Sequence, residues 1–461
     1  MSGVDFAKLA KKIASRILLM VYPYVAWPLH LMHSGVALGY LLWLWRYGRH
    51  RIGSQPVSTE SAPTIVMLVV TALDRAPRVE RGARVLAANG FQVTIICPAW
   101  RGVSLQTAAQ IDWGPGITFC ILPKRAARFA FYFPYLFDGH MLRAAVREPA
   151  WAYHAHDLTT TFIGLIAAAH KRAVCVCDFH EWYSENVTYH SWSQTYRPHP
   201  PLKRWLFQVF ERLALHTATG VITVCESIAA DLEKRFQAPQ PVHVIRNIPV
   251  IQPVGPDVPP CEDVRAILGI PADKLIVLYQ GGLGPSRNLE PAIKAMAEVP
   301  EAVLVIRGPE HEIYGQVYHE LARRVGVGER VYCVGPVPSA RIVEEAKAGD
   351  VGLWTLLANV GLNFHYALGN KIFEYLAAGL PLLVADLPEA RRLVEQYQVG
   401  LCFDPDSPAS IGAAINRMVE DHSFRKACIA NIPRAFQALR ADQEWDKLVD
   451  IYRGLQAPHE S

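Results

Sequence analysis

The sequence has few cysteines, and no two of them stand in a CxxC spacing. There are nine in 461 residues, an odd number, and several fall in or beside apolar runs that favour strands. These are Cys97, Cys175, Cys177, Cys225 and Cys333. In such runs cysteine behaves as a small hydrophobic residue. The pattern argues against a disulfide framework and favours a reducing, cytoplasmic environment.

A concentrated basic surface is also missing from most of the chain. The formal net charge is only +4. Residues 1–53 hold seven Lys or Arg against a single acidic residue, Asp5, so the rest of the chain is slightly acidic. No basic stripe of the kind that binds nucleic acid is present, and we expect no nucleic-acid partner.

Charge of either sign is absent between Ile17 and Trp45. One bilayer crossing needs about 20 apolar residues, but Pro23 and Pro28 would kink or break a helix here. Both flanks are basic, which favours a cytoplasmic position for both, and no signal-peptide cleavage site follows. Residues 1–53 are therefore predicted to associate with the cytoplasmic face of a membrane, a bacterial inner membrane, as a re-entrant or interfacial segment. A single crossing, or an apolar arm packed on the protein or on a partner, remain alternatives.

What the chain does contain is two runs of strands that alternate with helices. Hydrophobic residues make up 51% of the chain, enough for two cores. Nearly continuous apolar strands separated by helices indicate parallel sheets covered on both faces. Strands are predicted near 65–70, 91–96, 117–121, 151–155, 173–177, 221–224, 242–246, 275–280, 302–306, 330–334, 350–355 and 381–385.

The fold class that follows is α/β, with two doubly wound Rossmann-like domains. Six prolines between Ile248 and Pro271 mark the boundary, and ligands of such sheets sit beyond the carboxyl ends of the strands. The predicted parts are a membrane-associating segment 1–53, a linker 54–63, a first domain 64–248, an interdomain linker 249–271, a second domain 272–434, and a C-terminal helix 435–461 that packs back across the domains.

The most specific motif runs from Gly369 to Pro381. It places Asn370, Lys371 and Glu374 at the start of a short helix. Helix N-termini favour anions, and a lysine there adds a full positive charge. A carboxylate one turn later can accept hydrogen bonds from ribose hydroxyls. The motif suits a nucleoside diphosphate, although an ordinary amphipathic helix that stops at Gly379 would look similar.

A glycine-rich turn follows the predicted strand 275–280. Gly281 and Gly282 would let backbone amides approach a phosphate closely, and Arg287 would supply a planar, permanently charged fork. A plain strand-to-helix turn with a surface arginine is the alternative.

Two clusters end neighbouring strands of the first domain, and both could carry acid–base chemistry. Helix capping and loop hydrogen bonds are the simpler interpretation. The same side chains could instead bind a divalent metal, as in a metallohydrolase, although such an enzyme has no use for a second domain with anion-binding turns. The clusters are His154, His156 and Asp157, and Asp178, His180 and Glu181.

Three further groups lie where predicted strands end. Asp74 and Arg78 could contact an acceptor or pair with each other, and Val337 could receive a base beside its backbone. Asn363 could reach donor hydroxyls, as could its neighbours Asn359 and His365. Ordinary loop interactions would explain each of these groups equally well.

Together these residues resemble the GT-B glycosyltransferases of family 4, over about Thr64 to Leu455. The matching segments are Tyr279-Gln280-Gly281-Gly282-Leu283, Arg287-Asn288-Leu289-Glu290 and the motif from Asn370 to Pro381. The first domain adds His154-Ala155-His156-Asp157, Asp178-Phe179-His180-Glu181 and Val244-Ile245-Arg246-Asn247-Ile248-Pro249.

The resemblance implies roles for particular residues. It places Gly281, Gly282, Arg287 and Lys371 at the donor diphosphate, and Asn363, Asn370 and Glu374 at the donor ribose or sugar. Val337 would lie beside the nucleobase. His156 and Glu181 would be the catalytic pair, and Asp74, Asp157 and His180 would face the acceptor. One departure concerns a glutamate that many members carry eight residues before Glu374, where this chain has Tyr366.

The resemblance implies retaining transfer from a nucleotide-diphospho-sugar without a metal or other cofactor. The N-terminal segment suggests a lipid-linked or polysaccharide acceptor in cell-envelope glycan synthesis. Two other functions stay open. One is a nucleotide-sugar epimerase of the same fold, and the other is a non-catalytic nucleotide-sugar-binding subunit held at a membrane.

Overall fold

The computed structural model describes residues 38–54, 62–71, 73, 76–99, 111–122, 138–190, 195–255 and 263–456. The chain divides into two compact units. Unit 1 contains residues up to Asp178 together with Leu213–Val221, and unit 2 contains Phe179–Arg212 and Ile222–Gly454. Segments 179–212 and 222–248, which the sequence places in the first domain, thus group with unit 2. The predicted domain boundaries stay predictions.

A seven-stranded sheet has the order β3-β2-β1-β4-β5-β8-β9. The pairs β1–β2, β1–β4, β2–β3, β4–β5 and β8–β9 are parallel. β4 and β5 are buried along their whole length, as expected for parallel strands that are covered on both faces. The strands are β1 (Thr64–Leu68), β2 (Gln92–Pro98), β3 (Ile117–Leu122), β4 (Ala152–His156), β5 (Val174–Phe179), β8 (Gly220–Thr223) and β9 (His243–Val244).

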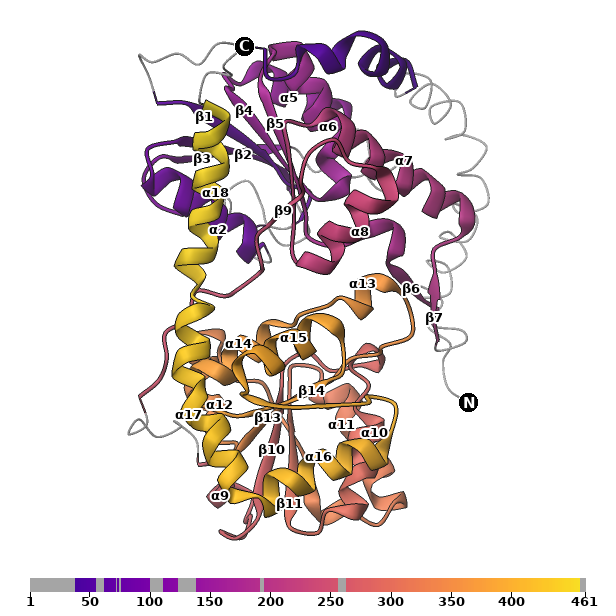
Figure 1. Ribbon diagram of the computed structural model, residues 1–461, viewed down its shortest axis with the longest axis vertical. Coiled ribbons are helices and arrows are strands. Elements are labelled where there is room, and N and C mark those ends of the chain that lie inside the picture. The colour runs from indigo at the N-terminus through magenta and orange to yellow at the C-terminus, as the bar shows by residue number, and fades with distance from the viewer. Residues whose placement is uncertain are drawn as a thin grey trace, which may run out of the picture. The chain divides into compact units, whose positions relative to one another are not determined.

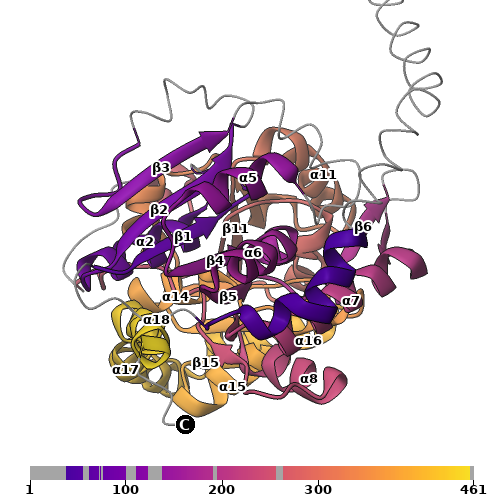
Figure 2. The same cartoon turned by 90° about the horizontal axis from the view of Figure 1, so that it is seen from above.

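Helices follow these strands in sequence. α2 lies on one side of the first strands, and α5 and α6 lie on the other (Figure 2). Asp138 caps α5 by accepting hydrogen bonds from the N–H groups of His140 and Met141, as expected for aspartate at a helix start. The helices are α2 (Pro77–Ala88), α5 (Gly139–Arg147), α6 (Asp157–Lys171), α7 (Pro201–Thr217) and α8 (Glu226–Phe236).

The second sheet has six strands in the order β12-β11-β10-β13-β14-β15 (Figure 1). β10 and β13 lie at its centre. β10 and β11 are wholly buried and pair in parallel over six residues each. The strands are β10 (Leu275–Gln280), β11 (Ala302–Arg307), β12 (Val331–Val334), β13 (Val351–Trp354), β14 (Leu382–Ala385) and β15 (Gly400–Phe403).

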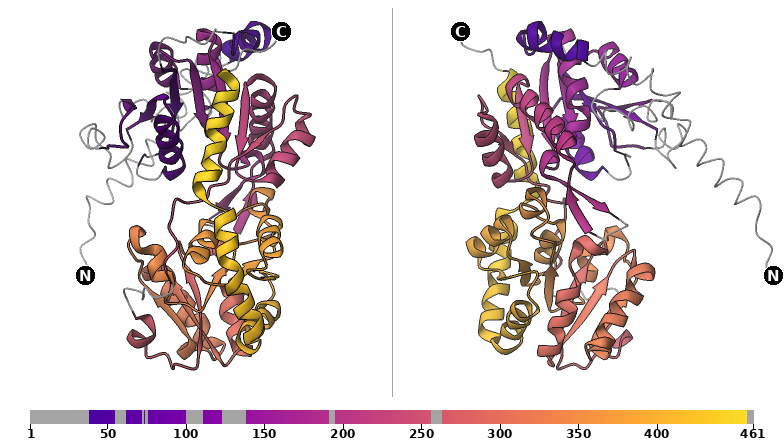
Figure 3. Two further views of the ribbon diagram at one scale, coloured as in Figure 1. Left: turned by 60° about the vertical axis from the view of Figure 1, so that its left-hand side comes forward. Right: turned by 90° about the vertical axis from the view of Figure 1, so that its right-hand side faces the viewer.

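Short 3₁₀ turns and helices connect these strands, and two helices in yellow end the described chain (Figure 3). The helices are α9 (Val264–Ile267), α10 (Glu290–Ala295), α11 (His311–Arg324), α12 (Ile342–Ala346), α13 (Leu362–His365), α14 (Asn370–Ala377), α15 (Pro388–Tyr397), α16 (Pro408–Glu420), α17 (His422–Ala438) and α18 (Ala441–Gln456). The 3₁₀ turns include η5 (Pro285–Arg287) and η6 (Met296–Glu298).

The described end of the N-terminal segment packs on unit 1. Residues 38–43 are helical and continue into a π-helical turn. Leu44 is fully buried, the Trp43 ring lies 5.4 Å from the His170 ring of α6, and Gly53 N–H donates to Ala173 O at 2.8 Å. Within the described part of the chain, no helix combines the length and apolarity needed to cross a bilayer. Residues 1–37 of the predicted membrane segment lie outside the described residues.

The two-domain α/β prediction is confirmed, and all twelve predicted strands are present. Several elements were missed. The hairpin of β6 (Val187–His190) and β7 (Thr195–Pro198) is antiparallel and largely exposed, so it lacks the apolar run of the sheet strands. β15 was missed as well, because Gly400–Phe403 is only four residues long and half-buried at its centre.

Candidate functional site

The glycine-rich turn leaves the carboxyl end of β10, at the centre of the second sheet. Gly281 has φ 139°, which only glycine adopts without strain. A Cβ added there would lie 2.1 Å from Lys371 Cε and 2.6 Å from Lys371 Nζ. Two segments ninety residues apart in sequence are therefore in direct contact, and the missing side chain is what makes room for the lysine.

Helix α14 begins against the neighbouring strand, β13. Gly369, its N-cap residue, offers no side chain to cap the helix, and a Cβ there would lie 2.3 Å from Trp354 Nε1. The buried Tyr375 hydroxyl accepts from Gln280 N–H at 2.8 Å and donates to Leu353 O at 3.2 Å. These contacts fix the start of α14 beside the end of β10, where uncapped N–H groups suit an anion.

Opposite charges meet around the lysine. Burial, followed by the Arg287 guanidinium, lowers the pKa of Lys371 to about 8, while Glu374 and Glu310 act in the opposite direction. Burial raises the pKa of Glu374, against the effect of Lys371. The Lys371 ammonium lies 5.3 Å from the centre of the Tyr279 ring. Arg287 and Lys371 are thus close enough to repel each other, a cost that a bound dianion would remove.

Glu310 is a member of this group that the sequence analysis missed. Its Oε2 accepts from Leu283 N–H at 2.8 Å, and a Cβ at Gly282 would lie 3.9 Å from both this oxygen and Arg287 Nη2. Glu310 therefore shapes the turn between β10 and η5. Its position just after β11, the next strand of the sheet, was the signal that could have revealed it.

Replacing Gly281 by alanine tests this packing. We expect Gly281→Ala to weaken nucleoside diphosphate binding at least about tenfold, because the new methyl group displaces Lys371 and the backbone is strained by about 1–3 kcal/mol. Gly326→Ala is the matched control, since Gly326 also has positive φ (77°) but open space around it. Calorimetric titration with UDP and thermal unfolding would separate the two effects. Equal UDP binding by both variants would contradict the assigned contact.

The remaining residues predicted for the donor also lie in unit 2, in different settings. Asn370 is the first residue of α14, and Val337 is half-buried after β12. Asn363 lies in α13, where its Oδ1 accepts from Trp182 N–H at 2.8 Å. This hydrogen bond uses the amide oxygen of Asn363 and leaves its amide nitrogen to donate to a sugar hydroxyl. The role of Asn363 at the donor remains a prediction.

Tyr366, at the position of the expected glutamate, is held by Asp231 and Trp182. Its hydroxyl donates to Asp231 Oδ2 at 2.9 Å, and its ring stacks on Trp182 at 6.3 Å and 10°. Burial, followed by the bond to Asp231, raises its pKa to about 12. The tyrosine therefore acts as a packed neutral group, whereas a glutamate here would be a charged acceptor.

In unit 1, His154, His156 and Asp178 form a buried cluster at the ends of β4 and β5. The two imidazole rings stack at 4.3 Å, and Asp178 Oδ2 lies 3.6 Å from His154 Nε2 and from His156 Nδ1. Arg78 of α2 binds both carboxylate oxygens, at 2.9 Å through Nε and 2.8 Å through Nη2. Arg78 thus binds a carboxylate of β5. Asp74 lies outside the described residues, so the suggested pairing of Arg78 with Asp74 stays a prediction.

The geometry of this cluster bears on the metal alternative. The candidate ligand atoms of His154, His156 and Asp178 lie within 4.8 Å of one another, so they could surround an ion. However, a guanidinium already uses both oxygens of the only carboxylate in the group. A divalent cation would have to replace Arg78 or bind beside its charge. The donor set therefore fits a metal poorly, and metal independence remains a prediction.

The other predicted residues of the first domain have separate surroundings. Asp157 opens α6 with φ 65°, a strained value for a residue with a side chain. His180 and Glu181 follow β5, and the exposed Glu181 accepts a hydrogen bond from Asn186 Nδ2. Asp74 lies outside the described residues. The catalytic and acceptor-side roles of these residues remain predictions.

Family models match both halves of the chain. Residues 78–248 match the model described as Glycosyltransferase Family 4, and residues 261–435 match the model described as Glycosyl transferases group 1. The chain belongs to the GT-B glycosyltransferases of family 4. It is therefore an enzyme of the glycosyltransferase class. The Gly281 turn and α14 lie within the second matched segment.

Several glycosyltransferases are similar to this family 4 chain. A D-inositol 3-phosphate glycosyltransferase of Thermomonospora curvata is 24% identical over 42% of this chain and 46% of its own length. One from Nocardioides sp. is 23% identical over 81% of this chain and 83% of its own. The chain thus spans about half the length of the first relative and most of the second.

Solved structures share the fold at low identity. A sucrose-phosphate synthase from Thermosynechococcus elongatus gives a TM-score of 0.64 at 18% identity, with 85% of this chain and 99% of that chain covered. HepE from Anabaena, in complex with UDP-glucose, gives 0.63 at 17% identity, with 85% and 99% covered. At these identities the likeness establishes the GT-B fold.

Proposed function

We propose that this glycosyltransferase moves a sugar from a nucleotide-diphospho-sugar to a lipid-linked or polysaccharide acceptor in cell-envelope glycan synthesis. The observation that carries the proposal is the meeting of Arg287 and Lys371 at the carboxyl end of β10, where Gly281 leaves room for the lysine. Two cations and an uncapped helix start would stabilise the charge that develops on a leaving diphosphate.

Glu374 supplies the second recognition element of this proposal. It follows Lys371 by three residues on α14, so the two side chains lie on neighbouring positions of the same helix. Burial raises the pKa of Glu374, but a ribose diol can donate hydrogen bonds to it and compensate for the lost hydration. The HepE structures are complexes with UDP and with UDP-glucose, which supports a uridine-type donor for the first trial.

Retention at the anomeric carbon and independence of metal complete the proposed reaction. The two cations beside Gly281 can take the place of a metal ion at the diphosphate, and Arg78 occupies the carboxylate that a metal would need. His156 and Glu181 are the proposed catalytic residues. A panel of nucleotide-sugars with lipid and oligosaccharide acceptors, read by mass spectrometry and by NMR of the product anomer, tests the proposal. Product formation that stops after chelation and returns with a divalent metal would contradict it.

The pH dependence of donor binding follows from Lys371. Its pKa of about 8 means that the cation is present below pH 8 and is lost as the pH rises through this value. The diphosphate keeps its charge over this range because its last ionisation lies near about 6. We therefore expect UDP affinity to fall between pH 7 and pH 9.5 with a midpoint near 8, measured by calorimetry. Lys371→Arg should remove the dependence, and an unchanged profile in that variant would assign it elsewhere.

We also propose that the N-terminal segment holds the enzyme on the cytoplasmic face of a bacterial inner membrane. Leu38, Leu42 and Tyr47 are 55%, 57% and 62% exposed, and Arg46 and Arg49 are exposed beside them. Apolar side chains among basic ones suit an anionic lipid surface.

Exchange of these three apolar residues for serine tests the membrane proposal. We expect the triple variant Leu38→Ser, Leu42→Ser and Tyr47→Ser to lose at least about tenfold in affinity for phosphatidylglycerol vesicles, because each exposed apolar side chain contributes about 1.5–3 kcal/mol when buried. Sedimentation with vesicles measures this. Ile313→Ser, at another exposed apolar residue, is the control. Equal sedimentation of the triple variant and the control would contradict the proposed membrane contact.

A further inference from the structure

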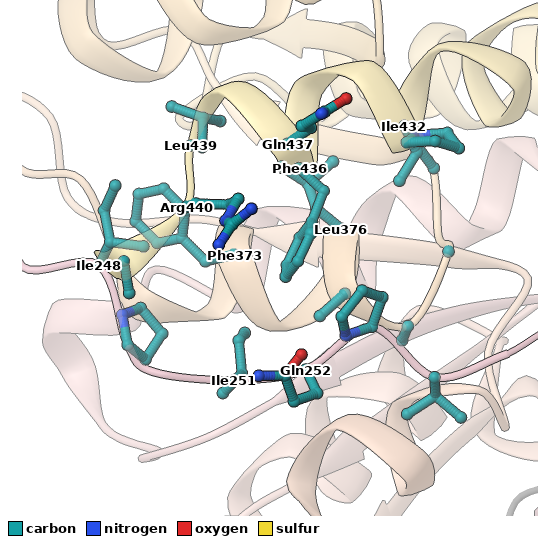
Figure 4. Close-up of a pocket in the computed structure, with 18 of the residues that line it drawn as sticks. Ile248, Ile251, Gln252, Phe373, Leu376, Ile432, Phe436, Gln437, Leu439 and Arg440 are labelled. Atoms are coloured by element: carbon teal, nitrogen blue, oxygen red, sulfur yellow. The ribbon is translucent and has the colours of Figure 1, made fainter. Parts of the chain in front are cut away.

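Unit 2 contains a cavity with a volume of about 870 Å³, and neither Gly281 nor Arg287 lines it. Three segments line it. The first is the chain from Ile248 to Gly255, the second is the later part of α14, and the third is α17 with the residues that follow it (Figure 4). The volume falls within the range of about 300–1,000 Å³ that small-molecule sites occupy. None of the residues assigned to the donor lines this cavity.

The lining is largely hydrocarbon. Phe373 and Leu376 come from α14, and Ile432 and Phe436 come from α17. Ile429, also on α17, is 42% exposed. Pro433, inside α17, removes one of the helix hydrogen bonds on this side. A cavity with such walls, open to solvent at one rim, suits a flexible apolar chain.

A single guanidinium stands among these walls. Arg440 binds Asp442 through two hydrogen bonds, one of 2.9 Å from Nε. Both side chains are about half exposed, at 48% and 54%, so the pair lies where the cavity meets solvent. In Figure 4 the labelled side chains with polar atoms are Arg440, Gln437 and Gln252, among side chains that are otherwise carbon. Arg440 binds the Asp442 carboxylate through two nitrogens, and the same planar arrangement could bind the carboxylate of a ligand.

The cavity and the donor residues share helix α14. Lys371 and Glu374 belong to one face of this helix, and Phe373, Leu376 and Ala377 contribute to the cavity. Val254 N–H donates to Ala377 O at 3.0 Å, which ties the lining chain to the end of the helix. Lys371 fits closely over Gly281, so a small displacement of α14 would change the position of its ammonium.

We propose that this cavity binds a single-chain amphiphile with a carboxylate head, and that its occupancy changes the affinity of the donor site. The chain of the amphiphile packs on Phe373, Leu376, Ile432 and Phe436, and its carboxylate replaces Asp442 at Arg440. The coupling rests on the proposed donor site, whereas binding in the cavity does not. Because coupling between two sites is reciprocal, UDP changes the affinity for the amphiphile by the same factor.

Equilibrium dialysis of the full chain with palmitate, below its micelle concentration, tests the binding. We expect saturable binding that weakens about tenfold in Ile429→Asp, which places a carboxylate at the rim, and in Arg440→Gln. Ile313→Asp and Arg434→Gln are matched controls, since Ile313 is exposed on α11 and Arg434 is exposed on α17, and neither lines the cavity. Absence of saturable binding, or equal binding by all four variants, would overturn the site. Hexadecanol that binds as tightly as palmitate would overturn the carboxylate assignment.

Calorimetric titration with UDP, with and without palmitate, tests the coupling. We expect UDP affinity to change at least about threefold on saturation with palmitate in the unmodified chain and to stay constant in Ile429→Asp. Unchanged UDP affinity in the unmodified chain would overturn the coupling. UDP binding without palmitate is measured in the same experiment, so a failure of the donor site itself would be recognised separately.

Discussion

Arg287→Ala and Lys371→Ala are each expected to reduce kcat/KM for sugar transfer at least about tenfold, or about 1.4 kcal/mol. Both cations converge on the turn after β10, where the leaving diphosphate gains charge in the transition state. Loss of an interaction that strengthens as this charge develops lowers kcat, whereas loss of one already complete in the ground state affects only KM. We therefore expect kcat to fall in both variants, with a smaller loss in UDP affinity.

The loss should be specific to these two positions. Arg324→Ala and Lys426→Ala remove exposed cations from α11 and α17 of the same unit, and both should retain normal turnover. Because Arg287 and Lys371 repel each other across the turn, the double variant should lose less than the two single losses combined. Near-normal turnover in either single variant would show that this residue does not bind the diphosphate. The proposed donor would then lose its structural support.

Arg78→Met is expected to cost about 3–5 kcal/mol of unfolding free energy, the range measured when one partner of a buried ion pair is removed. The side chains of Arg78 and Asp178 are 4% and 3% exposed and form two hydrogen bonds of 2.8 and 2.9 Å. Methionine preserves much of the side-chain volume but leaves the Asp178 carboxylate buried without its cation. Denaturant unfolding monitored by circular dichroism would measure the loss.

Arg84→Met on the same helix is the control. Arg84 pairs with Glu80 at 2.9 Å, but the two side chains are 49% and 36% exposed, so solvent screens the pair and its loss should cost less than about 1 kcal/mol. Similar losses in the two variants would mean that the α2 surface, rather than the buried pair, determines stability. A large loss in Arg78→Met alone would show that Arg78 holds the carboxylate beside His154 and His156.

The central strands of both sheets were predictable because of their burial. β10 was placed at residues 275–280 and observed at Leu275–Gln280, since a strand covered on both faces must be apolar throughout. The same argument does not reach the hairpin strands β6 and β7 or the edge strand β15. β6, β7 and β15 are short and partly exposed, so their sequences do not differ from those of loops.

Candidate binding residues could be predicted where a recognisable motif follows the end of a strand. Lys371 and Arg287 stand in turns whose composition already favours an anion. The sequence did not reveal what Glu310 and Arg78 bind, because their partners, the Leu283 amide and Asp178, are distant in sequence. Tyr366 was noticed as a departure from the expected glutamate, but only the structure supplies its bond to Asp231.

The sequence by itself determined the two parallel sheets and the glycine-rich turns at their strand ends. A buried strand requires apolar residues and a tight turn requires glycine, and both requirements can be read from the order of residues along the chain. Only the tertiary structure decided which charges meet. Lys371 lies over Gly281 because Tyr375 fixes α14 beside β10, and Arg78 binds Asp178 because α2 returns to the edge of β5. Electrostatic pairing depends on distance in space, which residue order does not specify.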